Sequence, residues 1–142
     1  MSDRELAVEA WESLFRAQHE IYTAMSEDFE GSDLMPAEYD VLLTVTRCAS
    51  YTARLRDVTA RMLISQPSVS RLVDRMVARG LLVKQPDPED GRGTLVHATD
   101  RGLRAFRQLA TVHGRSIADR MSRLDDEELR ALRDLTAKLR GV

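Results

Sequence analysis

Apolar side chains recur every three or four residues along most of the chain, which is the spacing of one buried helix face. The first such stretch covers about residues 5–29, and Ser2 with Glu5 has the spacing of a helix-capping box. The same pattern predicts five more helices. Three lie in the middle of the chain: from Pro36 to about residues 47–50, over about 55–62, and over about 66–79 with a stop at Gly80. The last two begin at Thr99 or Asp100 and at a second capping box formed by Asp125 and Glu128.

Two short β-prone stretches interrupt the helical pattern. LLVKQ at residues 81–85 and TLVHAT at residues 94–99 have the composition of strands and are close enough to pair as a hairpin. The segment between them, PDPEDGRG, is charged and longer than an ordinary hairpin turn of about two to five residues. We therefore predict a mainly α fold with a small β-hairpin whose long tip is available for binding.

Composition narrows the class of protein. The chain has 142 residues, of which 43% are hydrophobic and 31% charged, as expected for one globular domain. No apolar run approaches the about 20 residues needed to span a bilayer, and the acidic N-terminus lacks the features of a secretory signal. These features predict a cytoplasmic protein with no membrane partner.

Charge is distributed unevenly, although the net charge is only −2. Residues 1–40 hold eleven acidic and two basic side chains, whereas residues 54–84 hold seven basic and two acidic ones. A basic segment of this kind favours an anionic partner such as nucleic acid.

The basic segment contains a predicted amphipathic helix at residues 66–79. Val69, Leu72, Val73 and Met76 predict its buried face, and Ser65 is a candidate N-cap. Arginine can bind guanine in the major groove, glutamine suits adenine, and serines with a helix N-terminus hold phosphates. The candidate DNA-recognition residues are Gln66, Pro67, Ser68, Ser70, Arg71 and Arg75. The alternative is a surface helix whose arginines are only solvated.

The hairpin tip completes a winged helix-turn-helix pattern of short helix, tight turn, second helix and hairpin. Arg92 lies between two glycines and could enter the narrow minor groove, with Asp90 orienting its guanidinium group. The tip acids do not follow the calcium-loop pattern, and we expect no metal or cofactor. Other basic residues are candidates for phosphate contact or internal pairing: Arg54, Arg61, Arg79 and Lys84.

The terminal helices predict a homodimer. A first helix of about 25 residues would be about 37 Å long, more than a small domain needs, and both end helices carry apolar faces. A second copy of the chain is the simplest partner for those faces. We predict one compact chain with dimerisation segments at 1–34 and 100–142 around a winged helix-turn-helix module at 35–99.

The sequence resembles the MarR family of bacterial transcription regulators over nearly its whole length. The stretches that carry the resemblance are LMPAEYDVLLTV, LRDVTARMLISQPSVSRLVDRMVARGLLVKQ, DPEDGRG, ATDRG and LDDEELRAL. The resemblance implies a homodimer that binds pseudo-palindromic operator DNA as a repressor and is released by a small molecule or an oxidant. Two positions depart from the family pattern, because Gly91 replaces the first of two basic wing residues and Met35 replaces a Ser or Thr helix cap.

The resemblance also implies an effector, for which a small aromatic or anionic molecule is the candidate. The residues that could form its pocket are Trp11, Phe15, His19, Tyr39 and Arg56. Aromatic side chains at helical spacing are also typical of a core or a dimer interface, so both interpretations stay open. Cys48, the single cysteine, excludes an internal disulfide and leaves redox sensing as a separate hypothesis.

Nothing in the sequence predicts an enzyme. His19, His97 and His113 belong to separate elements, and there is no metalloprotease, nucleophile-elbow or phosphate-loop motif. The alternative to a DNA-binding regulator is a winged-helix protein–protein interaction module that does not bind DNA directly.

Overall fold

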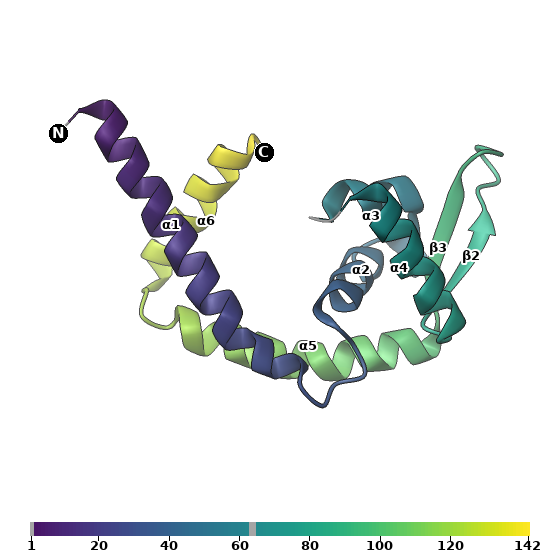
Figure 1. Cartoon of the computed structure of the whole chain (residues 1–142). Helices are drawn as coiled ribbons and strands as arrows, with labels where there is room; N and C mark the ends of the chain where they lie inside the picture. Colours follow the sequence, from purple (N-terminus) through teal and green to yellow (C-terminus); the bar gives the residue numbers. More distant parts are fainter. Residues whose placement is uncertain (1, 63–64) are drawn as a thin grey trace. The chain divides into compact units, whose positions relative to one another are not determined.

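The computed structural model describes residues 2–62 and 65–142, most of which are helical (Figure 1). Its helices are α1 (Asp3–Met25), α2 (Pro36–Thr46), α3 (Leu55–Arg61), α4 (Gln66–Ala78), α5 (Asp100–Met121) and α6 (Asp126–Arg140). Its strands are β1 (Thr52–Arg54), β2 (Leu82–Pro86) and β3 (Thr94–Ala98). The predicted mainly α fold with a small hairpin is confirmed. Ile64, in the predicted break ISQP, lies outside the described residues.

Local capping contacts start two of the helices where the sequence predicts. The Ser2 hydroxyl accepts the Glu5 N–H at 3.2 Å, and the Glu5 carboxylate accepts the Ser2 N–H at 2.8 Å. Asp125 and Glu128 make the same reciprocal pair before α6, at 2.9 and 3.0 Å. Each pair satisfies backbone donors that the helix itself leaves without acceptors.

Two helix ends differ from the prediction. Helix α1 ends at Met25 rather than near residue 29, and a 3-10 turn over Ser26–Phe29 follows it. Met35, before α2, has no hydroxyl to serve as a cap, and a weaker helix start was therefore expected. Glu38 compensates, because its Oε1 accepts the Met35 N–H at 2.8 Å.

A third strand, which the sequence analysis missed, joins the hairpin. Strand β1 pairs antiparallel with β3, so the order in the sheet is β1-β3-β2, with Ala53 opposite Val96 and Leu82 opposite Ala98. With only three residues, β1 is too short for a periodic pattern to identify it. Its pairing places Arg54, at the end of β1, opposite Leu95, beside the tip of the hairpin.

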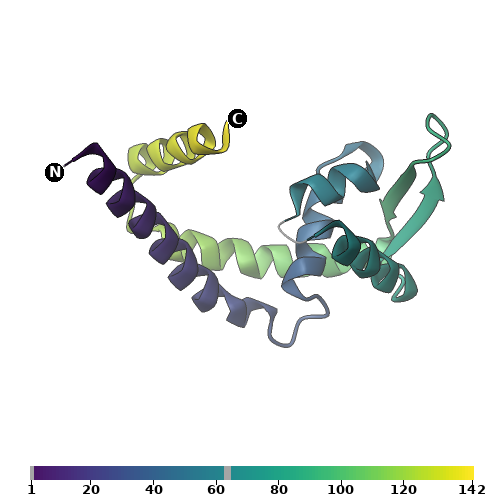
Figure 2. The same cartoon turned by 45° about the horizontal axis from the view of Figure 1, so that its top comes forward.

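The chain divides into two compact units, Phe29–Thr111 and Met1–Asp28 with Val112–Val142, and α5 contributes to both. The first of these, here called the winged unit, contains the hydrophobic core. The side chains that are at most 1% exposed come from α2, α3, α4, the segment after α4 and the strands: Val41, Leu42, Val45, Val58, Val69, Val73, Met76, Leu81, Leu82 and Val96. The core therefore holds helix α4 against the sheet and α2. Within this unit, the hairpin of β2 and β3 extends beyond α3 and α4 (Figure 2).

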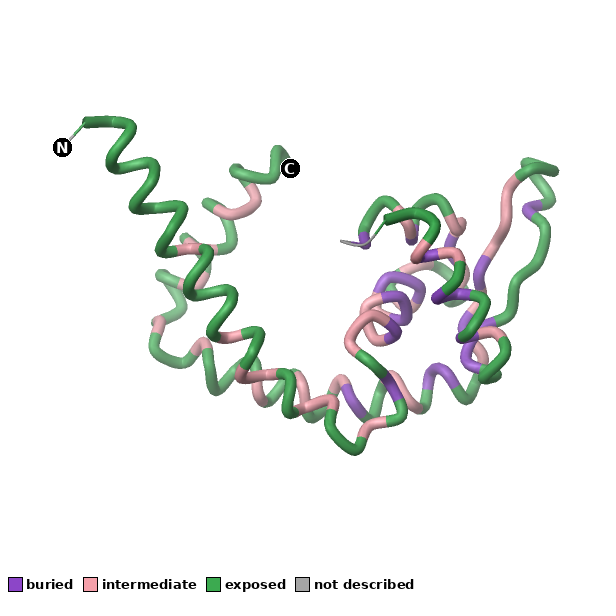
Figure 3. The backbone as a smooth tube through the Cα atoms, viewed as in Figure 1, coloured by how far each residue is buried: buried purple, intermediate pink, exposed green. Residues whose placement is uncertain are grey.

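The second unit, here called the helical unit, has little interior of its own. Neither α1 nor α6 contains a buried residue, and Figure 3 shows α1 exposed along most of its length. Large apolar side chains such as Trp11 and Leu139 are 61% and 76% exposed. None of the described helices is both long enough and apolar enough to cross a membrane.

Candidate nucleic-acid interface

Helix α4 presents one apolar and one polar face, as its sequence predicts. Val69, Leu72, Val73 and Met76 are all buried, because they recur every three or four residues and pack into the core of the winged unit. The predicted recognition residues lie on the other side. Gln66, Pro67, Arg71 and Arg75 are exposed, and Ser68 and Ser70 are half-buried.

The N-terminus of α4 is arranged differently from the prediction for Ser65. Ser65 has the extended backbone of an N-cap residue, but its side chain caps no backbone N–H. Its hydroxyl instead donates to the Ser68 hydroxyl at 3.1 Å. The first-turn N–H groups of α4 therefore receive no acceptor from Ser65 and remain available to an anion such as phosphate.

The hairpin tip, residues 87–93, is held in shape by Asp87. This side chain is 4% exposed, and its carboxylate contacts Arg54 Nε at 3.2 Å and accepts the Glu89 N–H at 2.9 Å. Arg54 also donates from Nη2 to Glu89 Oε2 at 3.0 Å. The Asp87 N–H donates to the Gly93 carbonyl at 3.0 Å and so closes the base of the tip.

The predicted role of Asp90 is wrong in its detail. Asp90 Oδ1 accepts the backbone N–H of Arg92 at 3.1 Å, and no ion pair joins it to the Arg92 guanidinium in residues 2–62 and 65–142. The Asp90 carbonyl also accepts the Gly93 N–H at 2.8 Å. Asp90 therefore shapes the backbone of the turn, because an aspartate two residues before an N–H forms a local turn readily. The exposed side chain of Arg92 is left available for a ligand.

Ion pairing divides the predicted phosphate contacts into two groups. Arg54 pairs with Asp87 and Glu89, Arg79 pairs with Glu38, and Lys84 contacts Asp74 at 2.8 Å. These three cations serve internal contacts. Within the described part of the chain, no side-chain hydrogen bond or ion pair engages the guanidinium groups of Arg61, Arg71, Arg75 and Arg92.

The sequence analysis missed two acidic residues on which this arrangement depends. Asp87 was considered only as a calcium ligand, and Glu38 not at all, yet both are buried and both hold an arginine. Glu38 did carry a local signal, since it is the third residue of α2 and can accept a hydrogen bond from the residue before that helix. Asp87 carried none, because its partner Arg54 is distant in sequence.

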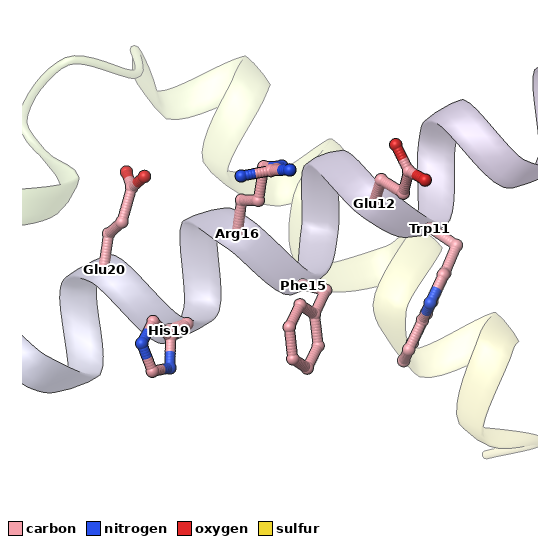
Figure 4. A pocket seen from close by; sticks show the side chains of 6 residues that line it. All are labelled: Trp11, Glu12, Phe15, Arg16, His19 and Glu20. Atoms are coloured by element: carbon pink, nitrogen blue, oxygen red, sulfur yellow. The ribbon is translucent and has the colours of Figure 1, made fainter.

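The candidate effector residues fall into separate places. Trp11, Phe15 and His19 form a ladder along one side of α1, with ring centroids 5.8 and 6.4 Å apart, and they line an open hollow of about 260 Å³ (Figure 4). Tyr39 belongs to the winged unit, where it stacks on Phe106 at 5.1 Å.

Arg56 also belongs to the winged unit, but it has different neighbours. It lines a small cavity of about 40 Å³ with Arg54, Asp87 and Asp90 at the base of the hairpin tip. The structure therefore brings three of the five candidates together and assigns the other two to different surroundings.

Comparison with known proteins gives consistent matches. A sequence model described as the MarR family matches residues 32–93, which include helices α2, α3 and α4, strand β2 and the hairpin tip. YkoM of Bacillus subtilis, an uncharacterised helix-turn-helix transcriptional regulator, is 29% identical over 133 residues, which cover 90% of this chain and 84% of that protein.

Two solved structures share the fold. Sco3205 from Streptomyces coelicolor, a MarR family regulator in complex with DNA, has a TM-score of 0.84 at 20% identity and covers 98% of this chain and 87% of its own. BpsR of Bordetella bronchiseptica, whose DNA binding is regulated by 6-hydroxynicotinic acid, has a TM-score of 0.80 at 24% identity, with 92% of each chain covered.

Proposed function

We propose that this chain is a winged helix-turn-helix transcription regulator of the MarR family, a ligand-responsive repressor that binds a pseudo-palindromic operator as a homodimer. Its sequence relatives are transcriptional regulators rather than enzymes. Since operator DNA lies in the cytoplasm of a bacterium, the proposal includes a cytoplasmic location.

The division between paired and unpaired arginines carries the proposal. On α4 and the hairpin tip, Arg71, Arg75 and Arg92 are exposed and have no internal partner among the described residues, although acidic side chains pair with other cations of the same unit. An unpaired guanidinium group is suited to base edges and phosphates. We assign Arg71, with Gln66, to base contacts in the major groove and Arg92 to the minor groove.

The exposed apolar side chains of the helical unit support a homodimer. Leu6 and Val8 on α1 are 59% and 48% exposed, and Leu135 and Leu139 on α6 are 61% and 76% exposed. Apolar surfaces of this extent mark protein interfaces, and an isologous contact covers the same face on both copies. Two recognition helices related by a two-fold axis would bind half-sites about 10 base pairs apart.

An aromatic acid is the effector class that we propose. The Trp11–Phe15–His19 ladder offers stacking surface, and Arg16 lines the same hollow and could bind a carboxylate. The structural neighbour BpsR has its DNA binding regulated by 6-hydroxynicotinic acid, which is an aromatic acid. The hollow lies on the same helix as the proposed dimer interface, so ligand binding could act through that interface.

Selection from random double-stranded DNA tests the proposed function. The purified protein should enrich an inverted repeat, and its affinity for that sequence should fall steeply between two salt concentrations, because bound phosphates release counterions. Binding to a partner protein with little salt dependence, and no enriched DNA, would instead support the protein–protein interaction alternative. Repeating the titration with 6-hydroxynicotinic acid and with benzoate tests the effector class.

A further inference from the structure

The C-terminal end of helix α4 is attached to the start of α2 by one ion pair, in which the Glu38 side chain is 6% exposed and the Arg79 side chain is 40% exposed. Arg79 is the C-cap residue of α4, and its Nη1 donates to Glu38 Oε2. Its Nη2 donates to the backbone carbonyl of Asp33, in the segment just before α2. One guanidinium group therefore joins the end of α4 to two points near the start of α2.

Glu38 makes this attachment rigid. Its side chain is 6% exposed, and a carboxylate that is removed from water needs partners for its oxygen atoms. Oε2 accepts from Arg79, whereas Oε1 accepts the Met35 N–H at 2.8 Å. The same carboxylate thus caps α2 and holds α4.

The attachment point lies far from the residues proposed to contact bases. Helix α4 has 13 residues and is therefore about 20 Å long. A tilt of about 3° at its C-terminal end would displace Gln66, at its other end, by about 1 Å. Binding sites require their contact residues to be held within about 0.5 Å of the productive geometry.

We infer that Glu38 and Arg79 are positioning residues for DNA recognition, which set the orientation of α4 without touching DNA. The inference rests on the proposed function. Of the two roles that the sequence analysis left open for Arg79, phosphate contact and internal pairing, the inference selects internal pairing. Arg75, about one turn earlier on α4, is exposed and has no internal partner in the described residues, so it is the better candidate for a phosphate contact.

Glu38→Gln is the sharpest test, because electrostatics and positioning predict opposite results. Removing a negative charge should strengthen DNA binding if charge alone matters. If Glu38 positions α4, affinity for the selected operator should fall about tenfold, while affinity for scrambled DNA should not fall. The variant keeps an oxygen that can accept the Met35 N–H, so the cap of α2 is retained.

Glu30→Gln is the matched control for this change. Glu30 lies in the same unit, is exposed, and takes part in no side-chain hydrogen bond or ion pair among the described residues. The Glu30→Gln substitution removes one negative charge without altering the contact between Arg79 and Glu38. Its operator affinity should equal or slightly exceed that of the parent protein.

Arg79→Lys separates positioning from phosphate contact. Lysine is an adequate phosphate ligand, but it lacks the planar fork that joins the Glu38 carboxylate and the Asp33 carbonyl. Positioning predicts loss of operator preference at an unchanged salt dependence. The double variant Glu38→Gln/Arg79→Lys should bind no more weakly than the weaker single variant, because both changes break the same contact.

The outcomes distinguish this inference from the proposed function. If the parent protein enriches no DNA sequence, the proposed function fails and the inference fails with it. If the parent binds its operator but Glu38→Gln and Arg79→Lys bind equally well, only the inference is overturned. Arg79 would instead be a phosphate contact if Arg79→Lys keeps the operator affinity of the parent protein and Arg79→Ala lowers the slope of log affinity against log salt concentration by about one. Thermal unfolding of each variant verifies that the fold persists at the assay temperature.

Discussion

A β-carbon added to Gly102 in the first turn of α5 would lie 2.2 Å from the carbonyl oxygen of Leu81. The contact is with backbone rather than with a movable side chain, so it cannot be relieved by a rotamer change. Thr99 reinforces it, since its hydroxyl accepts the Gly102 N–H at 3.0 Å and donates to the Gly80 carbonyl at 2.6 Å. This close approach fixes the start of α5 against the segment that links α4 to β2.

Gly102→Ala is therefore expected to destabilise the protein, although alanine favours helix more than glycine does. Overpacking against backbone should cost about 1–3 kcal/mol after the gain in helix propensity. Urea unfolding measures the difference. Gly114→Ala, in the same helix, is the control, because no described atom beyond the local helix backbone lies within 4 Å of the added carbon, and it should stabilise by up to about 1 kcal/mol. Equal stability of the two variants would show that the approach of Gly102 to Leu81 is not a constraint.

Arg54→Gln should loosen the hairpin tip without unfolding the winged unit. The change removes the cation that holds the buried Asp87 carboxylate in place. The hydrogen bond from the Glu89 N–H to that carboxylate should then open more often. Amide hydrogen exchange at Glu89 should become about ten times faster. Arg56→Gln, a nearby change that breaks no internal ion pair of the described residues, should leave that exchange rate unaltered. An exchange rate that Arg54→Gln does not alter would contradict a structural role for Arg54.

Arg71→Ala and Arg92→Ala should affect DNA binding in different ways. If Arg71 contacts a base, its loss should cost about 1–3 kcal/mol and change the preferred base at one position of each half-site. Arg92→Ala should weaken binding with only a modest loss of sequence preference, because the minor groove distinguishes fewer base pairs. Repeating the site selection with each variant measures both effects. Arg104→Ala, an equal change in charge on α5, should retain the parent preference, and the same result for all three variants would refute the assignment.

Replacing both Leu135 and Leu139 with lysine should separate the dimer. These exposed leucines lie one helical turn apart on α6, and two charges cannot be buried in an apolar interface without a large desolvation cost. Sedimentation at micromolar concentration should change from two chains to one. Lys138→Ala, at an exposed neighbouring position, is the control and should stay dimeric. A dimer that persists in the double variant would mean that α6 lies outside the interface.

Asp40 should make folding stability depend on pH in an unusual direction. Burial raises the pKa of Asp40, and the nearby positive charge of Arg47 offsets part of that rise. The folded state then holds this proton more tightly than the unfolded state, so stability is lost as the pH rises from the usual aspartate pKa through the raised value.

Asp40→Asn should consequently unfold at a higher temperature than the parent at pH 7. The advantage should disappear below about pH 3.9, where Asp40 is protonated in both states. Thermal unfolding at the two pH values measures it, with Glu30→Gln as the control for net charge. An advantage that is equal at both pH values would rule out proton binding as its cause.

Local sequence determined the positions of most helices, because the contacts that start and stop a helix join residues that are close in the chain. The capping boxes at Ser2 and Asp125 involve partners three residues away. Gly80, which follows α4, adopts a φ of +75°, a conformation that glycine tolerates best. The alternation of buried and polar positions on α4 could also be predicted, because it repeats every three or four residues along the sequence.

Only the tertiary structure decided which cations are free to bind a ligand. Arg79 and Glu38 are 41 residues apart, and Arg54 and Glu89 are 35 apart, so no local pattern reports their pairing. Strand β1 escaped prediction because its identity depends on a distant partner strand. The sequence thus determined the helices and the resemblance to the MarR family. Folding determined which arginines of the described residues remain unpaired, because an ion pair requires two side chains to meet in space.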